Sequence, residues 1–295
     1  AMLDQWIADE DPRCRDCASP NARTLRTRVV ARGVRLSPGD EIALQGTGDY
    51  YEYARFDKIG FTPLQSPVIF DDGGVHTIDY PISAAEVQVH NGTTLNILTG
   101  AHLNRLVSVY NGTTTAQNVI NVYGGEIDTV ETAPGDICNI YGGTLRSVIN
   151  GDTIVVDGGR IDKLYSSGDG HYVTVSNGVI GEMEVRSIGG SLTISGGTFL
   201  GNVDIISEYT GWVVAISGGL FRGDINIDNV GVTLLTFYGD LKVDLVSEIE
   251  GDSVYVADYF VEGTLRDGSP ISTNLYYETY ACCDFYPWTN ITVEP

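Results

Sequence analysis

The chain has 295 residues, of which 42% are hydrophobic, and a formal net charge of −22 at pH 7. Such an acidic chain repels phosphate backbones and anionic lipid headgroups, which argues against nucleic acid and membrane surfaces as partners. The sequence has no run of about twenty apolar residues, so it predicts no membrane insertion. Its 36 glycines and 17 tyrosines favour turns and strands, and the expected fold class is all-β.

Residues 1–92 are expected to form an N-terminal cap and imperfect first coils of a repeat. Residues 1–27 are polar and irregular, whereas apolar pieces such as 42–44 and 68–70 are separated by Pro and Gly. The first residues lack the basic and apolar segments of a secretory leader, so we expect a mature or truncated form.

A short phrase recurs through residues 93–250 and marks the corners of this repeat. It consists of an apolar residue, a polar residue or tyrosine, a glycine-containing pair, a variable residue and a second apolar residue. The clear copies are 121–127, 139–145, 155–161, 174–180, 193–199, 215–221 and 236–241. The last glycine of each copy recurs after about 18–20 residues in most intervals, which suits one coil of a solenoid. Glycine is expected there because a sharp corner requires positive φ.

Three columns of the repeat are apolar throughout and predict the interior. The column before the corners contains Val122, Ile140, Val156, Val175, Ile194, Ile216 and Phe237. Polar residues alternate with these columns, as in strands with one buried face. The sequence therefore predicts a parallel β-helix over 93–250, with residues 93–112 as a further coil that has a longer connection to the next. Cys138 falls in an apolar column and is expected to be core filler.

Residues 251–295 are expected to form a C-terminal cap. Strand and hairpin signals at 253–256 and 263–270 precede a cluster of aromatic residues, and an open solenoid end needs such a cover.

The other four cysteines, Cys14, Cys17, Cys282 and Cys283, allow several interpretations. They could form disulfides that staple the terminal segments, hold zinc, or remain free or redox-active thiols. Adjacent cysteines do not easily supply two tetrahedral ligands, which disfavours zinc. The pairing pattern stays open.

The phrases at 121–127, 139–145 and 194–199 resemble those of bacterial right-handed parallel β-helix proteins, which include autotransporter-type passengers and the pectate-lyase-like superfamily. This resemblance covers the chain from residue 93 to residue 270 and implies a right-handed coil in an extracellular or cell-surface protein. It implies no single activity, because the superfamily includes lyases, hydrolases, epimerases and inert scaffolds.

Outward positions before the corners carry Asn121, Tyr123, Asn139 and Tyr141. Stacked side chains of these types stabilise sheets on their own account, and they could also form a face on which polysaccharide or cell-surface glycan binds. The sequence supports both interpretations.

Outward positions after the corners carry Glu184 and Asp204 in adjacent coils, with Lys163 and Arg186 close by. For a polysaccharide lyase, the resemblance implies calcium held by Glu184 and Asp204, and a base supplied by Lys163 or Arg186. The same cationic side chains could instead form ion pairs on a crowded acidic face.

The leading hypothesis is a noncatalytic, extracellular or surface-bound scaffold or adhesin that contacts glycans and requires no cofactor. The alternative is a secreted polysaccharide-active enzyme, above all a calcium-assisted polysaccharide lyase. The sequence leaves the oligomeric state open.

Overall fold

The computed structural model describes residues 67–109 except 83 and 85, 116–149, 153–207, 212–229, 233–250, 254–280 and 290–295, and two short strands, β1 (Ala8–Asp9) and β2 (Arg26–Thr27). The chain divides into two units, residues 1–61 and 62–295. In the first unit β1 and β2 pair antiparallel. Cys14, Cys17, Cys282 and Cys283 lie outside the described residues, so each interpretation of them stays a prediction.

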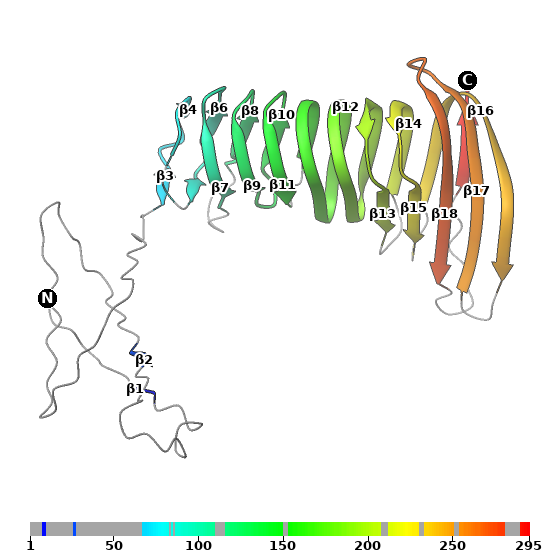
Figure 1. Ribbon diagram of the computed structural model, residues 1–295, viewed down its shortest axis with the longest axis horizontal. Helices are drawn as coiled ribbons and strands as arrows, with labels where there is room; N and C mark the ends of the chain where they lie inside the picture. The colour runs from blue at the N-terminus through cyan, green and yellow to red at the C-terminus, as the bar shows by residue number, and fades with distance from the viewer. Residues whose placement is uncertain are drawn as a thin grey trace, which may run out of the picture. The chain divides into compact units, whose positions relative to one another are not determined.

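The second unit is a parallel β-solenoid of about eight turns (Figure 1). Strands in equivalent positions of successive coils pair parallel and form two files. The first file begins with β4 (Val75–Ile78), β6 (Thr94–Ile97), β8 (Val119–Val122) and β10 (Ile137–Ile140). The second begins with β3 (Val68–Phe70), β5 (Val87–Val89), β7 (His102–Ser108), β9 (Glu126–Glu131) and β11 (Thr144–Ile149).

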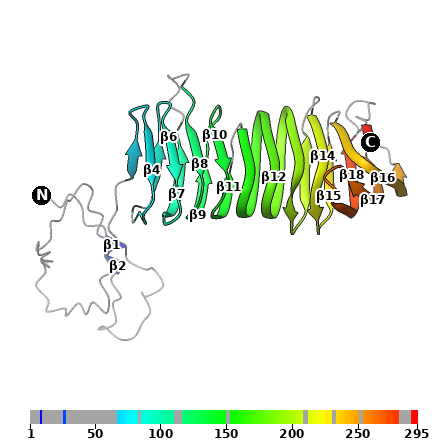
Figure 2. The same cartoon turned by 90° about the horizontal axis from the view of Figure 1, so that it is seen from above.

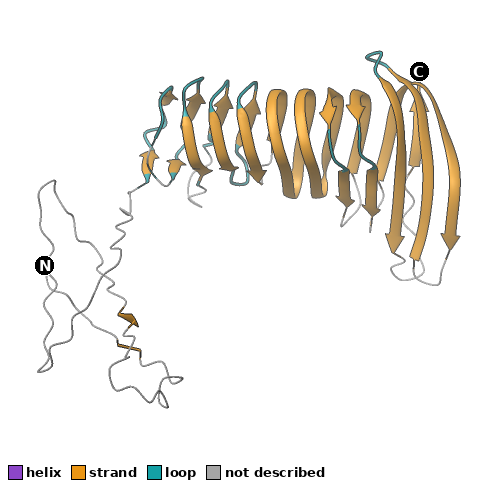
Figure 3. Ribbon diagram, viewed as in Figure 1, coloured by secondary structure: helices purple, strands orange, loops and turns teal. Residues whose placement is uncertain are grey.

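Both files continue through the long strand β12 (Thr153–Phe199), which winds through several coils. The first file continues from β12 to β14 (Trp212–Phe221) and β16 (Thr233–Glu250), and the second to β13 (Val203–Ser207) and β15 (Ile225–Asn229). Strands joined by short loops make up the described residues of this unit (Figure 3). No helix in the described part of the chain is long and apolar enough to span a membrane.

Glycines occupy the corners as the repeat predicted. The last glycine of each copy has a positive φ, and these residues are Gly125, Gly143, Gly159, Gly178, Gly197, Gly219 and Gly239. At Gly143, for example, φ is 86°, and an added Cβ would lie 2.9 Å from the carbonyl carbon of Gly124. The corner requires glycine because stacked coils bring backbone against backbone there.

The predicted apolar columns fill the interior. Val122, Ile140, Val156 and Val175 are all 0% exposed, as is the whole column before the corners. Cys138 is also 0% exposed, and burial raises the pKa of its thiol to about 12. It packs as a small apolar side chain, which confirms the prediction.

Coil length varies around the predicted value. Hydrogen-bonded partners in adjacent coils lie 18 residues apart at Asn121 and Asn139, and 25 residues apart at Asn96 and Asn121. The longer connection after residues 93–112 is therefore present. Among the described residues, parallel coils begin at Val68, inside the range 1–92 that was expected to hold a cap and imperfect first coils.

At the C-terminal end of the solenoid, where the last strands lie together in Figure 2, the pairing changes to antiparallel. From Gly239 onward β16 pairs with β17 (Val254–Leu265), and β17 pairs with β18 (Pro270–Tyr280). β18 then pairs parallel with β15, and β19 (Asn290–Glu294) pairs parallel with β16. The last strands of both files are thus paired by segments that come later in the chain.

Candidate functional site

The outward side of the first file, here called the amide face, carries a ladder of asparagines. Asn121 Nδ2 donates a hydrogen bond to Asn96 Oδ1, and Asn139 Nδ2 donates one to Asn121 Oδ1, both at 2.9 Å. The ladder forms because β6, β8 and β10 place these residues directly opposite one another in the parallel register. The structure therefore brings Asn121 and Asn139 together as the sequence predicted.

Tyr123 and Tyr141 also meet on the amide face, directly before their corners. Their ring centroids are 5.1 Å apart with an interplanar angle of 12°, and the two residues are 49% and 43% exposed. Each ring therefore covers one face of the other. A sugar ring could stack only on the two outer ring faces, so the pair is a narrower platform than two separate tyrosines would be.

The amide face remains mostly uncharged along the first file. Ser176 donates a hydrogen bond to the Asp157 carboxylate at 2.7 Å, and Thr292 donates one to Thr236 Oγ1 at 3.0 Å. Hydrogen-bonding groups thus follow the solenoid axis from coil to coil, about 4.8 Å apart.

The outward side of the second file near its C-terminal end, here called the acidic face, carries the predicted calcium ligands. Glu184 on β12 lies directly opposite Asp204 on β13. Arg186 Nε contacts Glu184 Oε1 at 2.5 Å, and Asn226 Nδ2 donates to Asp204 Oδ1 at 2.6 Å. Both carboxylates already have protein partners, and the described residues contain no group of three or more metal-binding side chains. The calcium site stays a prediction.

The two candidate bases are both in ion pairs. Lys163 Nζ lies 2.9 Å from Glu182 Oε2, with both side chains 67% exposed, while Arg186 contacts Glu184. These are the ion pairs that the non-catalytic interpretation expected. Their exposure means that each contributes little to stability.

A buried polar ladder that the sequence analysis missed runs along one corner of the first coils. Asn118 Oδ1 accepts hydrogen bonds from the backbone N–H groups of Gly92 and Thr93, at 2.9 and 3.2 Å. Asp136 in turn accepts from the backbone and side-chain nitrogens of Asn118, at 2.8 and 3.0 Å. Thr93, Asn118 and Asp136 are at most 5% exposed. The available signal was a polar residue immediately before each of β6, β8 and β10.

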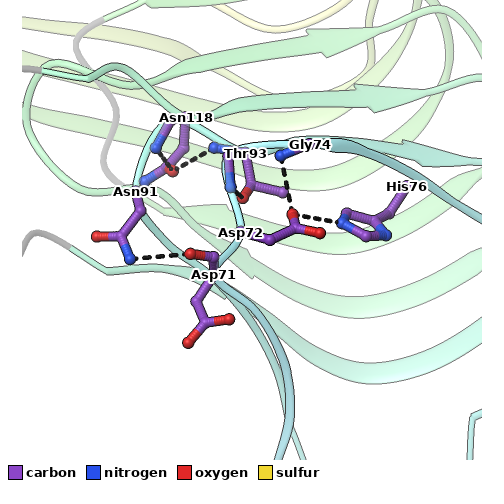
Figure 4. A network of polar contacts seen from close by, with 9 residues as sticks. Asp71, Asp72, Gly74, His76, Asn91, Thr93 and Asn118 are labelled. Atoms are coloured by element: carbon purple, nitrogen blue, oxygen red, sulfur yellow. Dashed lines mark hydrogen bonds and ion pairs between the residues drawn. The ribbon is translucent and has the colours of Figure 1, made fainter.

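The same corner extends to the first coil, where Gly73 N donates a hydrogen bond to Thr93 Oγ1 at 3.1 Å and Asp72 lies in the adjacent turn (Figure 4). Asp72 Oδ1 accepts a hydrogen bond from Gly74 N at 2.8 Å and lies 2.7 Å from His76 Nε2. The hydrogen bond with His76 and the one from Gly74 lower the pKa of Asp72. Asn91 Nδ2 donates to the carbonyl oxygen of Asp71 at 3.0 Å. These contacts hold turns in place, which is a structural role.

Comparisons with family models, with curated proteins and with solved structures each gave no significant match. The class of protein is therefore set by the fold, which is a parallel β-solenoid.

Proposed function

We propose that this chain is a noncatalytic extracellular or cell-surface scaffold or adhesin whose amide face contacts polysaccharide or cell-surface glycan. The observation that carries the proposal is the axial row of uncharged hydrogen-bonding groups formed by the partly buried asparagine ladder and the exposed Tyr123–Tyr141 pair. Neutral sugar rings present hydroxyl groups and apolar faces, which such a row matches.

The asparagine ladder keeps hydrogen-bonding capacity for a ligand. An amide has two N–H donors and two acceptor lone pairs. Asn121 uses one donor toward Asn96 and one lone pair toward Asn139. One N–H and one lone pair therefore remain at this position, and the neighbouring tyrosines add hydroxyl groups and two outer ring faces.

The contacts on the acidic face support a noncatalytic role. A general base must be free to accept a proton, and a calcium-binding carboxylate must turn its oxygens toward the ion. Lys163 and Arg186 instead lie against Glu182 and Glu184, and Asp204 accepts from Asn226.

Affinity electrophoresis through gels that contain soluble polysaccharides tests the glycan contact. We expect Tyr123→Ala and Tyr141→Ala to lose most of the retardation shown by the unaltered chain, because each removes half of the stacked pair. Tyr165→Ala is the control, since Tyr165 lies on β12 in the second file, opposite Ile149, and therefore outside the amide face. Retardation that all three variants retain equally, or its absence on every polysaccharide tried, would remove the glycan contact from the proposal.

Incubation with uronate polymers tests the noncatalytic part. A lyase forms an unsaturated product that absorbs ultraviolet light, and a calcium-assisted lyase stops when a chelator is added. We expect no rise in absorbance with or without calcium. A chelator-sensitive rise that Asp204→Asn abolishes would establish the enzyme instead.

A further inference from the structure

The parallel pairing of β18 with β15 joins the antiparallel sheet to the end of the solenoid. Ile225 lies opposite Leu275, Ile227 opposite Tyr277, and Asp228 opposite Glu278. Leu275 and Tyr277 are 0% and 4% exposed, so the inward side of this seam is apolar and packed. The two strands are about fifty residues apart in the chain, as the contact between Gly223 and Thr273 shows, and local chain connectivity does not hold them together.

One end of the seam is fixed by hydrogen bonds. Thr273 Oγ1 donates to the carbonyl oxygen of Gly223 at 2.9 Å, and Asn274 Nδ2 donates to Asp224 Oδ1 at 3.0 Å. These bonds lie just before the first residue pair of the parallel ladder. At this end, both strands therefore supply hydrogen-bonding groups that pair with one another.

The other end of the seam places like charges together. Asp228 and Glu278 are directly opposite in the register, where two carboxylates destabilise a strand pair. One residue further on, the Oγ1 atom of Thr279 is buried without a hydrogen-bond partner. A buried hydroxyl without a partner also favours local opening, because water can then bind it. Two independent features thus weaken the same end.

The charges around Asp228 come from every strand packed against it. Glu278 on β18 lies opposite Asp228. Arg186 on β12 lies one strand further away, with Ile206 of β13 between them, and its positive charge also acts on Asp228. The neighbouring row of the register contains two more carboxylates. Across β13, β15, β18 and β17 it consists of Asp204, Asn226, Tyr276 and Asp258. The charge of Glu278 opposes the ionisation of Asp228, and the charge of Arg186 favours it by less.

The protonation of Asp228 follows from this environment. Partial burial, and then the charge of Glu278, raise the pKa of Asp228, while Arg186 lowers it by less. A carboxyl group whose pKa is raised in the folded state stabilises that state at low pH. Its contribution begins to fall as pH rises past about 3.9, the ordinary pKa of Asp, and is lost once pH passes the raised value.

We propose that the β15–β18 seam is a pH-sensitive latch, which is closed along its whole length while Asp228 is protonated and opens at its Asn229–Thr279 end when Asp228 is ionised opposite Glu278. The fixed end and the apolar side stay paired, so opening is local. The last residues of β18 then gain freedom relative to β15.

Hydrogen–deuterium exchange of the full chain, followed by mass spectrometry at about pH 3 and about pH 7, tests the latch, since this range brackets the ordinary Asp pKa of about 3.9. After correction for the intrinsic exchange rate, the protection of the backbone amides of residues 275–280 against exchange should fall about two- to fivefold at the higher pH. This is the size expected for a like-charged cross-strand pair. Peptides covering β8 serve as the internal reference.

Variants separate the latch from general loosening. Asp228→Asn should make the protection of residues 275–280 independent of pH, and Glu278→Gln should reduce the pH effect without abolishing it, because the partial burial of Asp228 remains. Asp157→Asn is the control, because Asp157 lies on the amide face and accepts a hydrogen bond from Ser176; it should retain the full pH effect. Unchanged protection in the unaltered chain, or a pH effect that survives Asp228→Asn, would overturn the proposal.

Discussion

Gly143 shows at the scale of one residue why the repeat carries glycine at its corners. Its φ of 86° disfavours any side chain, and a Cβ would also press against the backbone of the previous coil. Gly170 has a similar φ of 71°, yet its added Cβ would meet nothing within 4 Å. A comparison of substitutions at the two residues therefore separates the cost of a left-handed backbone from the cost of steric conflict with the previous coil.

We expect Gly170→Ala to lower the free energy of unfolding by about 1 kcal/mol, the cost of left-handed backbone alone. Gly143→Ala should lower it by about 3 kcal/mol, because overpacking against backbone atoms adds to that cost. Denaturant titration followed by circular dichroism gives both values. Equal losses in the two variants would show that stacking of the coils does not restrict Gly143.

Residues whose role depends on local spacing were predictable, and residues whose role depends on a distant partner were not. The corner glycines and the buried Cys138 follow from the repeat itself. The amide that binds Asp204 belongs to Asn226, 22 residues later, and becomes visible only once the register of β13 and β15 is known. The stacked geometry of Tyr123 and Tyr141 likewise depends on ring orientation, which spacing does not encode.

At the scale of elements, the asparagine ladder connects β6, β8 and β10. Asn121 is its central member and takes part in both amide hydrogen bonds, whereas Asn96 takes part in one. Removing the central member should therefore disrupt the ladder more than removing its end.

Asn121→Ala should lower the free energy of unfolding by about 2 kcal/mol, and Asn96→Ala by about 1 kcal/mol, at roughly 1 kcal/mol for each hydrogen bond. Thermal or denaturant unfolding of both variants measures the difference. If the end variant proved as costly as the central one, the ladder would not act as a chain of paired amides.

Strand identity in the regular coils was predictable because each coil repeats its neighbour. The C-terminal strands were harder, since β18 has no equivalent in the repeat and pairs antiparallel with β17 as well as parallel with β15. A strand and hairpin signal at 253–270 anticipated β17 and the turn after it, but composition alone does not reveal which solenoid strand β18 joins.

At the scale of the whole molecule, the net charge of −22 opposes a compact state. We expect the midpoint of thermal unfolding to rise when monovalent salt increases from about 0.01 M to about 0.15 M, since the screening length falls from about 30 Å to about 8 Å. Differential scanning calorimetry measures the shift. A midpoint that falls with added salt would show that attractive ion pairs outweigh the repulsion.

Calcium at matched ionic strength provides the control for this experiment. If screening alone acts, calcium and sodium salts should raise the midpoint equally. An additional rise with calcium that disappears in Asp204→Asn would instead support the calcium site predicted at Glu184 and Asp204.

The pairing of β16 with β19, and of β15 with β18, has a consequence for how the protein is made. Synthesis delivers the early coils first, and each can stack on the one before it as it emerges from the ribosome. The two strands that cover the last coil emerge later, since Thr292 lies 56 residues after its partner Thr236. The nascent chain must therefore keep an unfinished apolar end shielded from other chains until those strands arrive.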